Sequence, residues 1–260
     1  MKNTLKISLV QTDIAWEDID ANLLHLNDLI YKVDSDTDIV ILPEMFSTGF
    51  SMETEKLAED FEGKTLRWMR SSAERYDIAL TGSLIFRQGS KIYNRLIWMN
   101  PSGTFSYYDK RHLFRMSGEN EFFSAGNSKL IIEYHGWKFC PMVCYDLRFP
   151  VWSRNKENYD VLIYIANWPA ARSFAWNTLL RARAIENQCY VAAVNRVGMD
   201  GWKVEYSGES MILDPMGTMI SQMPENNETI ISASLDFETL NDFKKKFPVN
   251  IDADDYTILI

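Results

Sequence analysis

The sequence predicts an α/β protein in which mixed sheets carry helices on their outer faces, and two observations support this. A strand at 6–11, an amphipathic helix at 19–33 and a second strand at 38–42 follow one another at the start of the chain. That second strand is apolar on both faces, as a covered parallel sheet requires. Further along, strands at 92–99 and 104–108 flank an Asn-Pro-Ser-Gly turn, which adds an antiparallel hairpin.

Each element is indicated by its own pattern. The strand at 6–11 alternates polar and apolar residues, and the helix at 19–33 repeats apolar residues at helical spacing. The run at 38–42 stops at Pro43. The same patterns predict helices at 64–76 and 172–188 and strands at 78–86, 130–134, 137–143, 159–166, 189–195 and 229–235, followed by a closing helix. Since repeats, low-complexity linkers and abrupt composition changes are absent from the sequence, we expect one domain over 1–260, with 248–260 as a C-terminal tail.

Composition and charge exclude several classes of function. The 260 residues include 36 acidic and 27 basic ones, for a net charge of −9, which disfavours nucleic acid and anionic membrane surfaces as partners. The first apolar run is too short for a signal peptide, and no stretch is long enough to span a bilayer. Three cysteines are too few for a secreted disulfide framework. We therefore expect a cytoplasmic protein with free thiols.

Cys144 is the candidate nucleophile. It directly follows the predicted strand 137–143, at a corner where unpaired backbone N–H groups and the start of a helix are expected. Both features lower the pKa of a thiol and favour an oxyanion pocket beside it. The alternative is an inert buried cysteine, which is our interpretation of Cys140 and Cys189.

Two more candidates follow other predicted strands. Glu44 comes directly after a buried strand and Pro43, where burial would raise the pKa of a carboxyl toward that of a general base; a helix-capping carboxylate is the alternative. Lys110 follows the strand 104–108 and suits a developing oxyanion, or is a surface lysine. His112 is close enough in sequence for a Cys–His pair to be considered, although no Asn or Asp suggests a triad.

Three motifs together resemble the nitrilase, or carbon–nitrogen hydrolase, superfamily. They are Leu-Pro-Glu at 42–44, Asp-Lys-Arg-His-Leu-Phe at 109–114 and Val-Cys-Tyr-Asp-Leu-Arg-Phe-Pro at 143–150. The resemblance runs from the first strand to about Leu235. It implies a four-layer α-β-β-α sandwich and a homodimer or larger homo-oligomer formed through helices.

The resemblance also implies roles for individual residues. Cys144 would be the nucleophile, Glu44 the base and Lys110 the group that stabilises the tetrahedral intermediate, together with the backbone N–H of Tyr145. Many members carry a second glutamate that orients the lysine and the substrate amide. Glu119 matches its position better than Glu121 does, although alanine replaces the usual proline in the turn that follows.

Two further stretches of sequence indicate which branch of the superfamily the chain resembles. Residues 165–176 and 179–188 look like the omega-amidases, which deamidate 2-oxoglutaramate or 2-oxosuccinamate. Arg172 would bind the distal carboxylate of such a substrate, or is a surface arginine at a helix start. Trp168 would line the pocket, or packs in the core.

The resemblance thus implies an amidase that passes through a Cys144 thioester and releases the dicarboxylate and ammonia, with no cofactor or metal. The acidic stretch at 252–255 lacks the glycine and distal glutamate of a calcium loop. Two alternatives stay open. One is an amidase or carbamoylase of the same fold with another small substrate, and the other is a catalytically silent dimeric scaffold.

Overall fold

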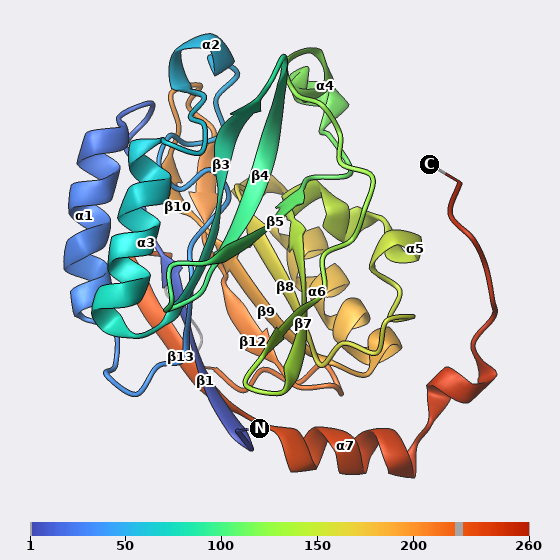
Figure 1. Cartoon of the computed structure of the whole chain (residues 1–260). Helices are drawn as coiled ribbons and strands as arrows, with labels where there is room; N and C mark the ends of the chain where they lie inside the picture. Colours follow the sequence, from blue (N-terminus) through green and yellow to red (C-terminus); the bar gives the residue numbers. More distant parts are fainter. Residues whose placement is uncertain (1, 222–225, 260) are drawn as a thin grey trace.

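The computed structural model describes residues 2–221 and 226–259, and its centre is a pair of β-sheets packed face to face (Figure 1). The larger sheet has six strands, in the order β13 (Thr229–Asp236), β1 (Thr4–Gln11), β2 (Ile39–Ile41), β3 (Ala79–Gln88), β4 (Lys91–Met99) and β5 (Phe105–Asp109). The smaller sheet has five, in the order β12 (Met211–Leu213), β9 (Tyr190–Asn195), β8 (Val161–Ala166), β7 (Trp137–Val143) and β6 (Ile132–Tyr134).

Helices cover the outer face of each sheet. α1 (Ile19–Tyr31) and α3 (Lys64–Tyr76) pack on the larger sheet, and α6 (Ser173–Asn187) packs on the smaller one (Figure 1). The apolar spacing seen in the sequence explains this, because Leu26 and Leu29 of α1 are buried while Leu24 is exposed. The layers therefore run helix, sheet, sheet, helix, and the predicted fold class is confirmed.

The remaining elements are short or terminal. They are α2 (Thr54–Leu57), α4 (Glu119–Phe122), α5 (Pro150–Ser153), α7 (Phe237–Lys246), the hairpin strands β10 (Val197–Met199) and β11 (Glu205–Ser207), and 3₁₀ turns at Arg115–Ser117, Cys144–Arg148, Ala170–Arg172 and Val249–Asp252.

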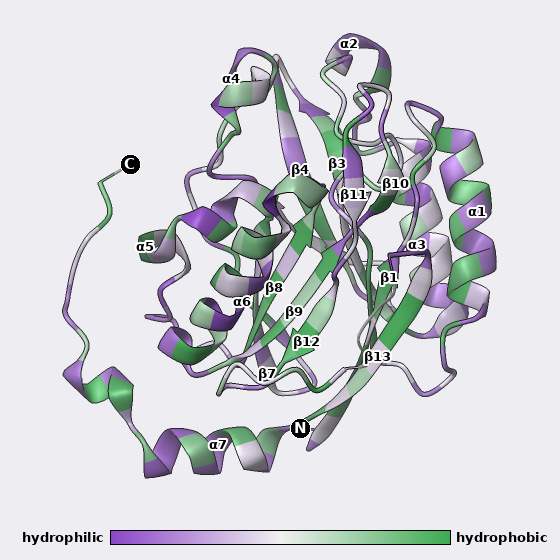
Figure 2. Ribbon diagram, turned by 180° about the vertical axis from the view of Figure 1, so that it is seen from behind, coloured by the Kyte–Doolittle hydropathy of each residue, from purple (hydrophilic) through white to green (hydrophobic). Residues whose placement is uncertain are grey.

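The main core lies between the sheets and consists of large apolar side chains. Trp98 of β4 and Phe139 of β7 are fully buried, and their ring centroids are 5.1 Å apart. Full burial of a large apolar side chain stabilises the fold by about 1.5–3 kcal/mol. In Figure 2 hydrophobic residues are concentrated in the central strands, as this packing requires. Contacts between side chains therefore set the position of one sheet relative to the other.

The strand directions bring the ends of several strands to one edge. β1, β2 and β3 are parallel, and two antiparallel pairings, β3 with β4 and β4 with β5, turn β5 back into the same direction. In the other sheet β7, β8 and β9 are parallel. Side chains just beyond the carboxyl ends of parallel strands face a crevice. The segments after β2, β5, β7 and β8 meet there.

Two segments differ from the sequence-based expectation. The chain after Cys144 forms a 3₁₀ turn and then the four-residue α5, where a regular helix was expected. The β10–β11 hairpin was not predicted, because its strands have three residues each and no continuous apolar run.

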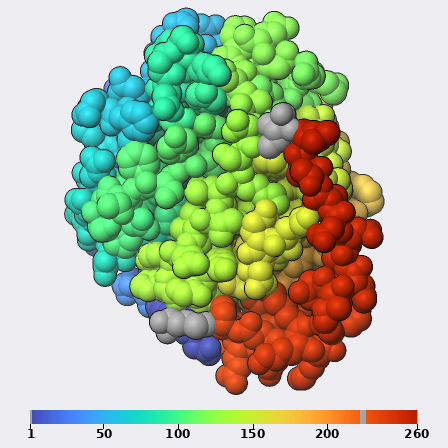
Figure 3. All heavy atoms as spheres, turned by 45° about the vertical axis from the view of Figure 1, so that its right-hand side comes forward, coloured from blue at the N-terminus to red at the C-terminus, as the bar shows by residue number. Residues whose placement is uncertain are grey.

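Beyond α7, the C-terminal segment lies against the surface around α5 (Figure 3). There the Tyr256 hydroxyl donates to the Val151 carbonyl over 2.9 Å. None of the described helices combines the length and the apolar character needed to cross a membrane.

Candidate active site

Cys144 lies where β7 ends and the 3₁₀ turn Cys144–Arg148 begins. Its φ of 43° is in the left-handed region, which is uncommon for a residue with a side chain. Such conformations persist only where the surroundings impose them, and they cluster at functional sites. The thiol is close to the backbone carbonyl of Asn167, at a distance of 3.8 Å between sulfur and oxygen.

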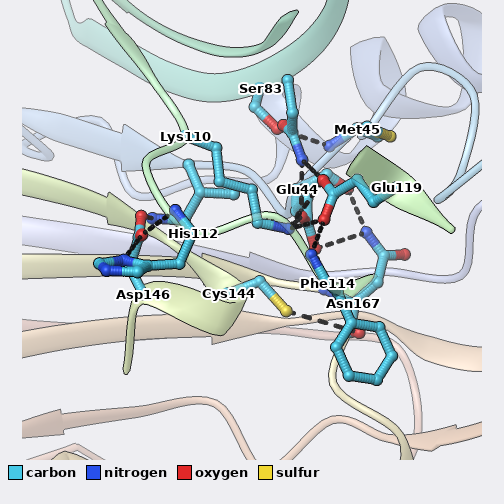
Figure 4. A network of polar contacts seen from close by, with 12 residues as sticks. Glu44, Met45, Ser83, Lys110, His112, Phe114, Glu119, Cys144, Asp146 and Asn167 are labelled. Atoms are coloured by element: carbon cyan, nitrogen blue, oxygen red, sulfur yellow. Dashed lines mark hydrogen bonds and ion pairs between the residues drawn. The ribbon is translucent and has the colours of Figure 1, made fainter. Parts of the chain in front are cut away.

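Lys110 connects two buried carboxylates beside this thiol (Figure 4). Its Nζ lies 2.9 Å from Glu44 Oε1 and 3.0 Å from both carboxylate oxygens of Glu119. Lys110 is 1% exposed and both glutamates are 0% exposed. The geometry discriminates between the two candidate second glutamates, because Glu121 is exposed to solvent while Glu119 contacts Lys110. Glu44, Lys110 and Glu119 thus form one buried cluster next to Cys144.

Two asparagines complete this cluster, and sequence reasoning missed both. Asn94 donates from Nδ2 to Glu44 Oε1 over 2.8 Å and to Glu119 Oε1 over 3.2 Å. The backbone N–H of Asn167 donates to Glu44 Oε2 over 2.9 Å. A signal existed for each. Asn94 lies inside β4 although asparagine is depleted in strands, and Asn167 follows a buried strand, as Glu44 does.

The ionisation of the cluster departs from one expectation. Burial raises the pKa of the Cys144 thiol well above its ordinary value, and the Glu44 carboxylate raises it further against the opposing Lys110 ammonium. The expectation of a lowered thiol pKa was therefore wrong, because packing around the thiol and the neighbouring Glu44 carboxylate both disfavour the thiolate. Cys144 rests as a neutral thiol and must lose its proton in order to react.

The other two charged groups of the cluster are shifted as well. Burial lowers the pKa of Lys110, but the carboxylates of Glu119 and Glu44 outweigh this and raise it overall, so the ammonium is retained. Burial raises the pKa of Glu119, and the Glu44 carboxylate adds to the effect, although Lys110 opposes it.

His112 does not pair with Cys144. Its Nδ1 lies 2.8 Å from Asp146 Oδ1, and its ring stacks on Phe149 with centroids 3.8 Å apart. The Cys–His arrangement considered from the sequence is thus not formed, because Asp146 holds the imidazole.

A cavity of about 530 Å³ opens above Cys144 and Lys110. Trp168, which is 3% exposed, lines it, so this side chain both packs in the core and forms a wall. Arg172 and Arg148 also line the cavity, and their guanidinium carbons lie 5.2 Å from the Phe114 ring and 4.8 Å from the Trp168 ring. Among the residues that the structure describes, neither arginine forms an ion pair with a carboxylate. The cavity lining thus includes six aromatic side chains and two cations that have no carboxylate partner among the described residues.

The unpredicted β10–β11 hairpin forms another wall of the cavity, with Asp200, Trp202, Val204 and Tyr206. The Tyr206 hydroxyl donates to Asp200 Oδ2 over 2.9 Å. A side chain at Gly201 would collide with Trp16, since a Cβ there would lie 2.4 Å from the indole nitrogen. Contacts between residues far apart in the sequence therefore determine the position of this wall.

The described part of the chain contains no group of three or more His, Cys, Asp or Glu side chains placed to hold a metal ion. The cavity floor presents a thiol and an ammonium, and two buried carboxylates contact the ammonium from behind. This set is suited to nucleophilic and acid–base chemistry.

Comparison with known proteins agrees with this site. The carbon–nitrogen hydrolase family matches residues 6–245. Omega-amidase YafV of Escherichia coli K12 is 44% identical over 256 residues, which cover 98% of this chain and 98% of that protein. The 2-oxoglutaramate amidase of Bacillus subtilis is 32% identical and covers 94% of this chain and 95% of its own length.

Among solved structures, XC1258 of Xanthomonas campestris, a CN-hydrolase superfamily protein, is similar with a TM-score of 0.96 and 42% identity over 99% of this chain and 100% of that chain. The family expected from the three motifs is therefore confirmed. The chain belongs to the carbon–nitrogen hydrolase (nitrilase) superfamily, on the omega-amidase side of it, and is a hydrolase of non-peptide carbon–nitrogen bonds with amidase activity on small amides.

Proposed function

We propose that the enzyme hydrolyses the terminal amide of a small 2-oxo-acid amide, 2-oxoglutaramate or 2-oxosuccinamate, to the dicarboxylate and ammonia through a thioester on Cys144. One observation carries the proposal. The Lys110 ammonium, held by Glu44 and Glu119, lies on the floor of the same cavity as Cys144. That cavity is also lined by two guanidinium groups that form no ion pair with any residue in the described part of the chain. Nucleophile, oxyanion partner and carboxylate-binding groups thus line one cavity, and the base contacts the oxyanion partner.

The first half-reaction forms the thioester. Glu44 takes the proton of the Cys144 thiol, and the sulfur attacks the amide carbonyl carbon. Lys110 and the backbone N–H of Tyr145 stabilise the oxyanion. The C–N bond then breaks as Glu44 returns the proton to the leaving nitrogen, and ammonia departs. Acid–base catalysis of this kind contributes about 10²–10⁴-fold. The raised pKa of the thiol makes Glu44 necessary for the attack.

The second half-reaction uses the same groups. Glu44 takes a proton from water as the water oxygen attacks the thioester carbon, and the second oxyanion meets the same two donors. The C–S bond breaks, the thiolate regains its proton from Glu44, and the dicarboxylate leaves. Glu119 orients Lys110 and the substrate amide, and its three contacts, with Lys110, Asn94 and the Phe114 N–H, fix it for that task.

Substrate selection falls to the cationic part of the cavity. Arg172 binds the distal carboxylate, because a guanidinium without an ion-pair partner can take both carboxylate oxygens. Arg148, whose guanidinium lies over the Trp168 ring, is the second such group, and it adds positive potential. The Trp168 indole N–H donates to the Arg172 carbonyl over 2.9 Å, so this side chain positions Arg172 as well as lining the pocket.

We further propose a cytoplasmic homodimer. The outer face of α6 carries Phe174 and Ile185, which are 83% and 55% exposed. Exposed apolar side chains on one face favour a protein partner. Cys140 and Cys189 are buried and free, which suits a reducing compartment.

A substrate panel tests the proposal. Ammonia and carbon dioxide are measured with 2-oxoglutaramate, 2-oxosuccinamate, neutral aliphatic amides and N-carbamoyl amino acids. The proposal expects the highest kcat/KM for the 2-oxo-acid amides, with ammonia as the only gas released. Preferred turnover of N-carbamoyl compounds with carbon dioxide would establish the carbamoylase alternative. A lack of turnover with every compound, despite an intact Cys144 thiol, would establish the silent scaffold.

A further inference from the structure

The two reacting groups of the proposed mechanism come from different sheets. Lys110 follows β5 of the six-stranded sheet, and Cys144 follows β7 of the five-stranded sheet. Backbone ladders fix each residue within its own sheet only. The distance between ammonium and thiol therefore depends on contacts between the segments that follow the two strands.

One buried carboxylate supplies such contacts. Asp146 is 0% exposed and accepts four hydrogen bonds. Its Oδ2 accepts from the Tyr108 hydroxyl over 2.8 Å and from the Val143 N–H over 3.0 Å. Its Oδ1 accepts from the backbone N–H of His112 over 3.0 Å and contacts His112 Nδ1 at 2.8 Å. The two oxygens of a carboxylate offer about four acceptor positions, so all are used.

The residues that Asp146 contacts flank the two reacting groups. Tyr108 and His112 lie two positions before and two positions after Lys110, and Val143 directly precedes Cys144. Figure 4 shows His112 and Asp146 side by side next to the Lys110–Cys144 cluster. One side chain thus links both flanks of Lys110 to the strained corner at Cys144.

The partners of Asp146 are themselves held in place. The Tyr108 hydroxyl accepts from the Trp152 indole N–H over 2.9 Å and from the Arg111 N–H over 3.2 Å, and the His112 ring stacks on Phe149 at 3.8 Å. Burial raises the pKa of Tyr108 well above its ordinary value, and the Asp146 charge adds to this, so the hydroxyl stays a donor. The network restrains β5, the loop 111–114 and the turn after β7 relative to one another, because its hydrogen bonds join all three segments.

We propose that Asp146 is a positioning residue which, through Tyr108 and His112, sets the placement of the Lys110 ammonium relative to the Cys144 thiol. This inference rests on the proposed function of those two residues. Asp146 is not among the residues that line the cavity, and it acts through its neighbours. A displacement of about 1 Å at a reacting group can cost about 10²-fold in rate.

The main test is Asp146→Asn, which keeps the size of the side chain but places an N–H where two donors need an acceptor. The readouts are kcat per Cys144 that iodoacetamide can label, KM, and the thermal midpoint. We expect kcat to fall about 10²-fold while KM changes less than about threefold, since the cationic part of the cavity is untouched.

Asp160→Asn is the matched control. Asp160 is 7% exposed and also accepts a backbone N–H, that of Lys138, over 2.9 Å. It lies next to the start of β8, at the far end of the sheet from Cys144. Its variant is expected to lose stability comparably and to keep kcat within about twofold of the wild type. Equal kcat per labelled site in wild type and Asp146→Asn would overturn the inference and leave Asp146 a structural residue.

A second pair of variants keeps the test decisive if Asp146→Asn does not fold. His112→Asn retains an N–H close to the place of Nδ1, whereas His112→Leu retains apolar packing on Phe149 without a donor. We expect His112→Asn to recover most of the kcat that His112→Leu loses. If the leucine variant is as active as the asparagine variant, the contact of His112 with Asp146 has no positioning role.

The failure of this inference is distinct from failure of the proposed function. Full activity in Cys144→Ala would end the proposed mechanism, and with it any role for Asp146 in positioning. An inactive Cys144→Ala combined with fully active Asp146→Asn would leave the mechanism standing and reject only the positioning role.

Discussion

The floor of the cavity and its rim are built in opposite ways. On the floor, Lys110 is 1% exposed, and its ammonium contacts carboxylate oxygens of both glutamates. On the rim, Trp202 is 52% exposed, and the guanidinium groups of Arg148 and Arg172 have no carboxylate partner among the described residues. A preorganised, water-poor floor suits charge stabilisation in a transition state. A rim with unpaired cations suits the capture of an anionic substrate. We therefore expect floor variants to change kcat and rim variants to change KM.

The floor is most sensitive to loss of its cation. Lys110→Ala removes an oxyanion partner, which alone costs about 10²–10³-fold in kcat, and also leaves Glu44 and Glu119 as adjacent buried carboxylates. We expect kcat to fall by an amount at or beyond the upper end of that range. Steady-state kinetics measures the fall, and circular dichroism verifies that the variant is folded. Lys129→Ala is the control, because Lys129 is also a largely buried lysine with a carboxylate partner, Glu157, but does not line the cavity. Turnover of Lys110→Ala within tenfold of wild type would contradict the assigned role.

A matched pair of glutamates compares a floor residue with a surface one. Glu119→Gln keeps the shape but loses a charge facing Lys110, and we expect kcat to fall about 10²-fold, as for other groups that orient reacting side chains. Glu121→Gln changes an exposed residue two positions away and is expected to stay within about twofold of wild type. Similar losses of kcat in both variants would contradict a specific role for the buried Glu119 carboxylate in orienting Lys110.

The rim is tested with substrates of different charge. Arg172→Ala should raise KM for a carboxylate-bearing amide about 10-fold or more, since charge-assisted hydrogen bonds are worth about 1.5–3 kcal/mol, and should leave neutral amides nearly unchanged. Arg148→Ala measures the contribution of the second cation to KM for the charged amide. Arg75→Ala is the control, because Arg75 lies on α3 and does not line the cavity. An equal rise in KM for charged and neutral amides would reject carboxylate binding by Arg172.

The raised pKa of Cys144 predicts how alkylation depends on pH. A raised pKa means that less thiolate is present at any given pH than for a free cysteine, whose pKa is about 8.5. We expect iodoacetamide to modify Cys144 several-fold more slowly than a peptide thiol at pH 7, with a rate that still climbs above pH 9. A rate that levels off below pH 8 would show a lowered pKa instead.

Sequence alone predicted the floor better than the rim, for a physical reason. Glu44, Lys110 and Cys144 each follow a strand whose pattern is visible locally, and their order matched a family. The hairpin wall with Trp202 and Tyr206 was missed, because its position depends on contacts with distant residues such as Trp16. The expected lowering of the Cys144 pKa failed for a similar reason. Burial beside Glu44 is a property of the assembled sheets and not of the strand end itself.

Other sequence-based expectations are still predictions. They include the single domain over 1–260, the assigned roles of the site residues, the homodimer and the cytoplasmic location. Local strand and helix patterns predicted an α/β domain with helices outside the sheets, and the four-layer sandwich was implied by the family resemblance. The bounds predicted for α3, 64–76, match the structure. The 3₁₀ turn after Cys144 could not be read from a local pattern, because it contacts residues far away in the sequence: Asp146 in this turn accepts a hydrogen bond from the Tyr108 hydroxyl.

The central claim is that Cys144 carries the acyl group during turnover. Rapid acid quench of the enzyme with 2-oxoglutaramate, followed by mass spectrometry of the peptide that contains Cys144, tests it most directly. The account predicts a transient mass increase on that peptide equal to the acyl group of the substrate after loss of ammonia, and none in Cys144→Ala. Steady turnover in Cys144→Ala, or an acyl group on a different residue, would contradict it.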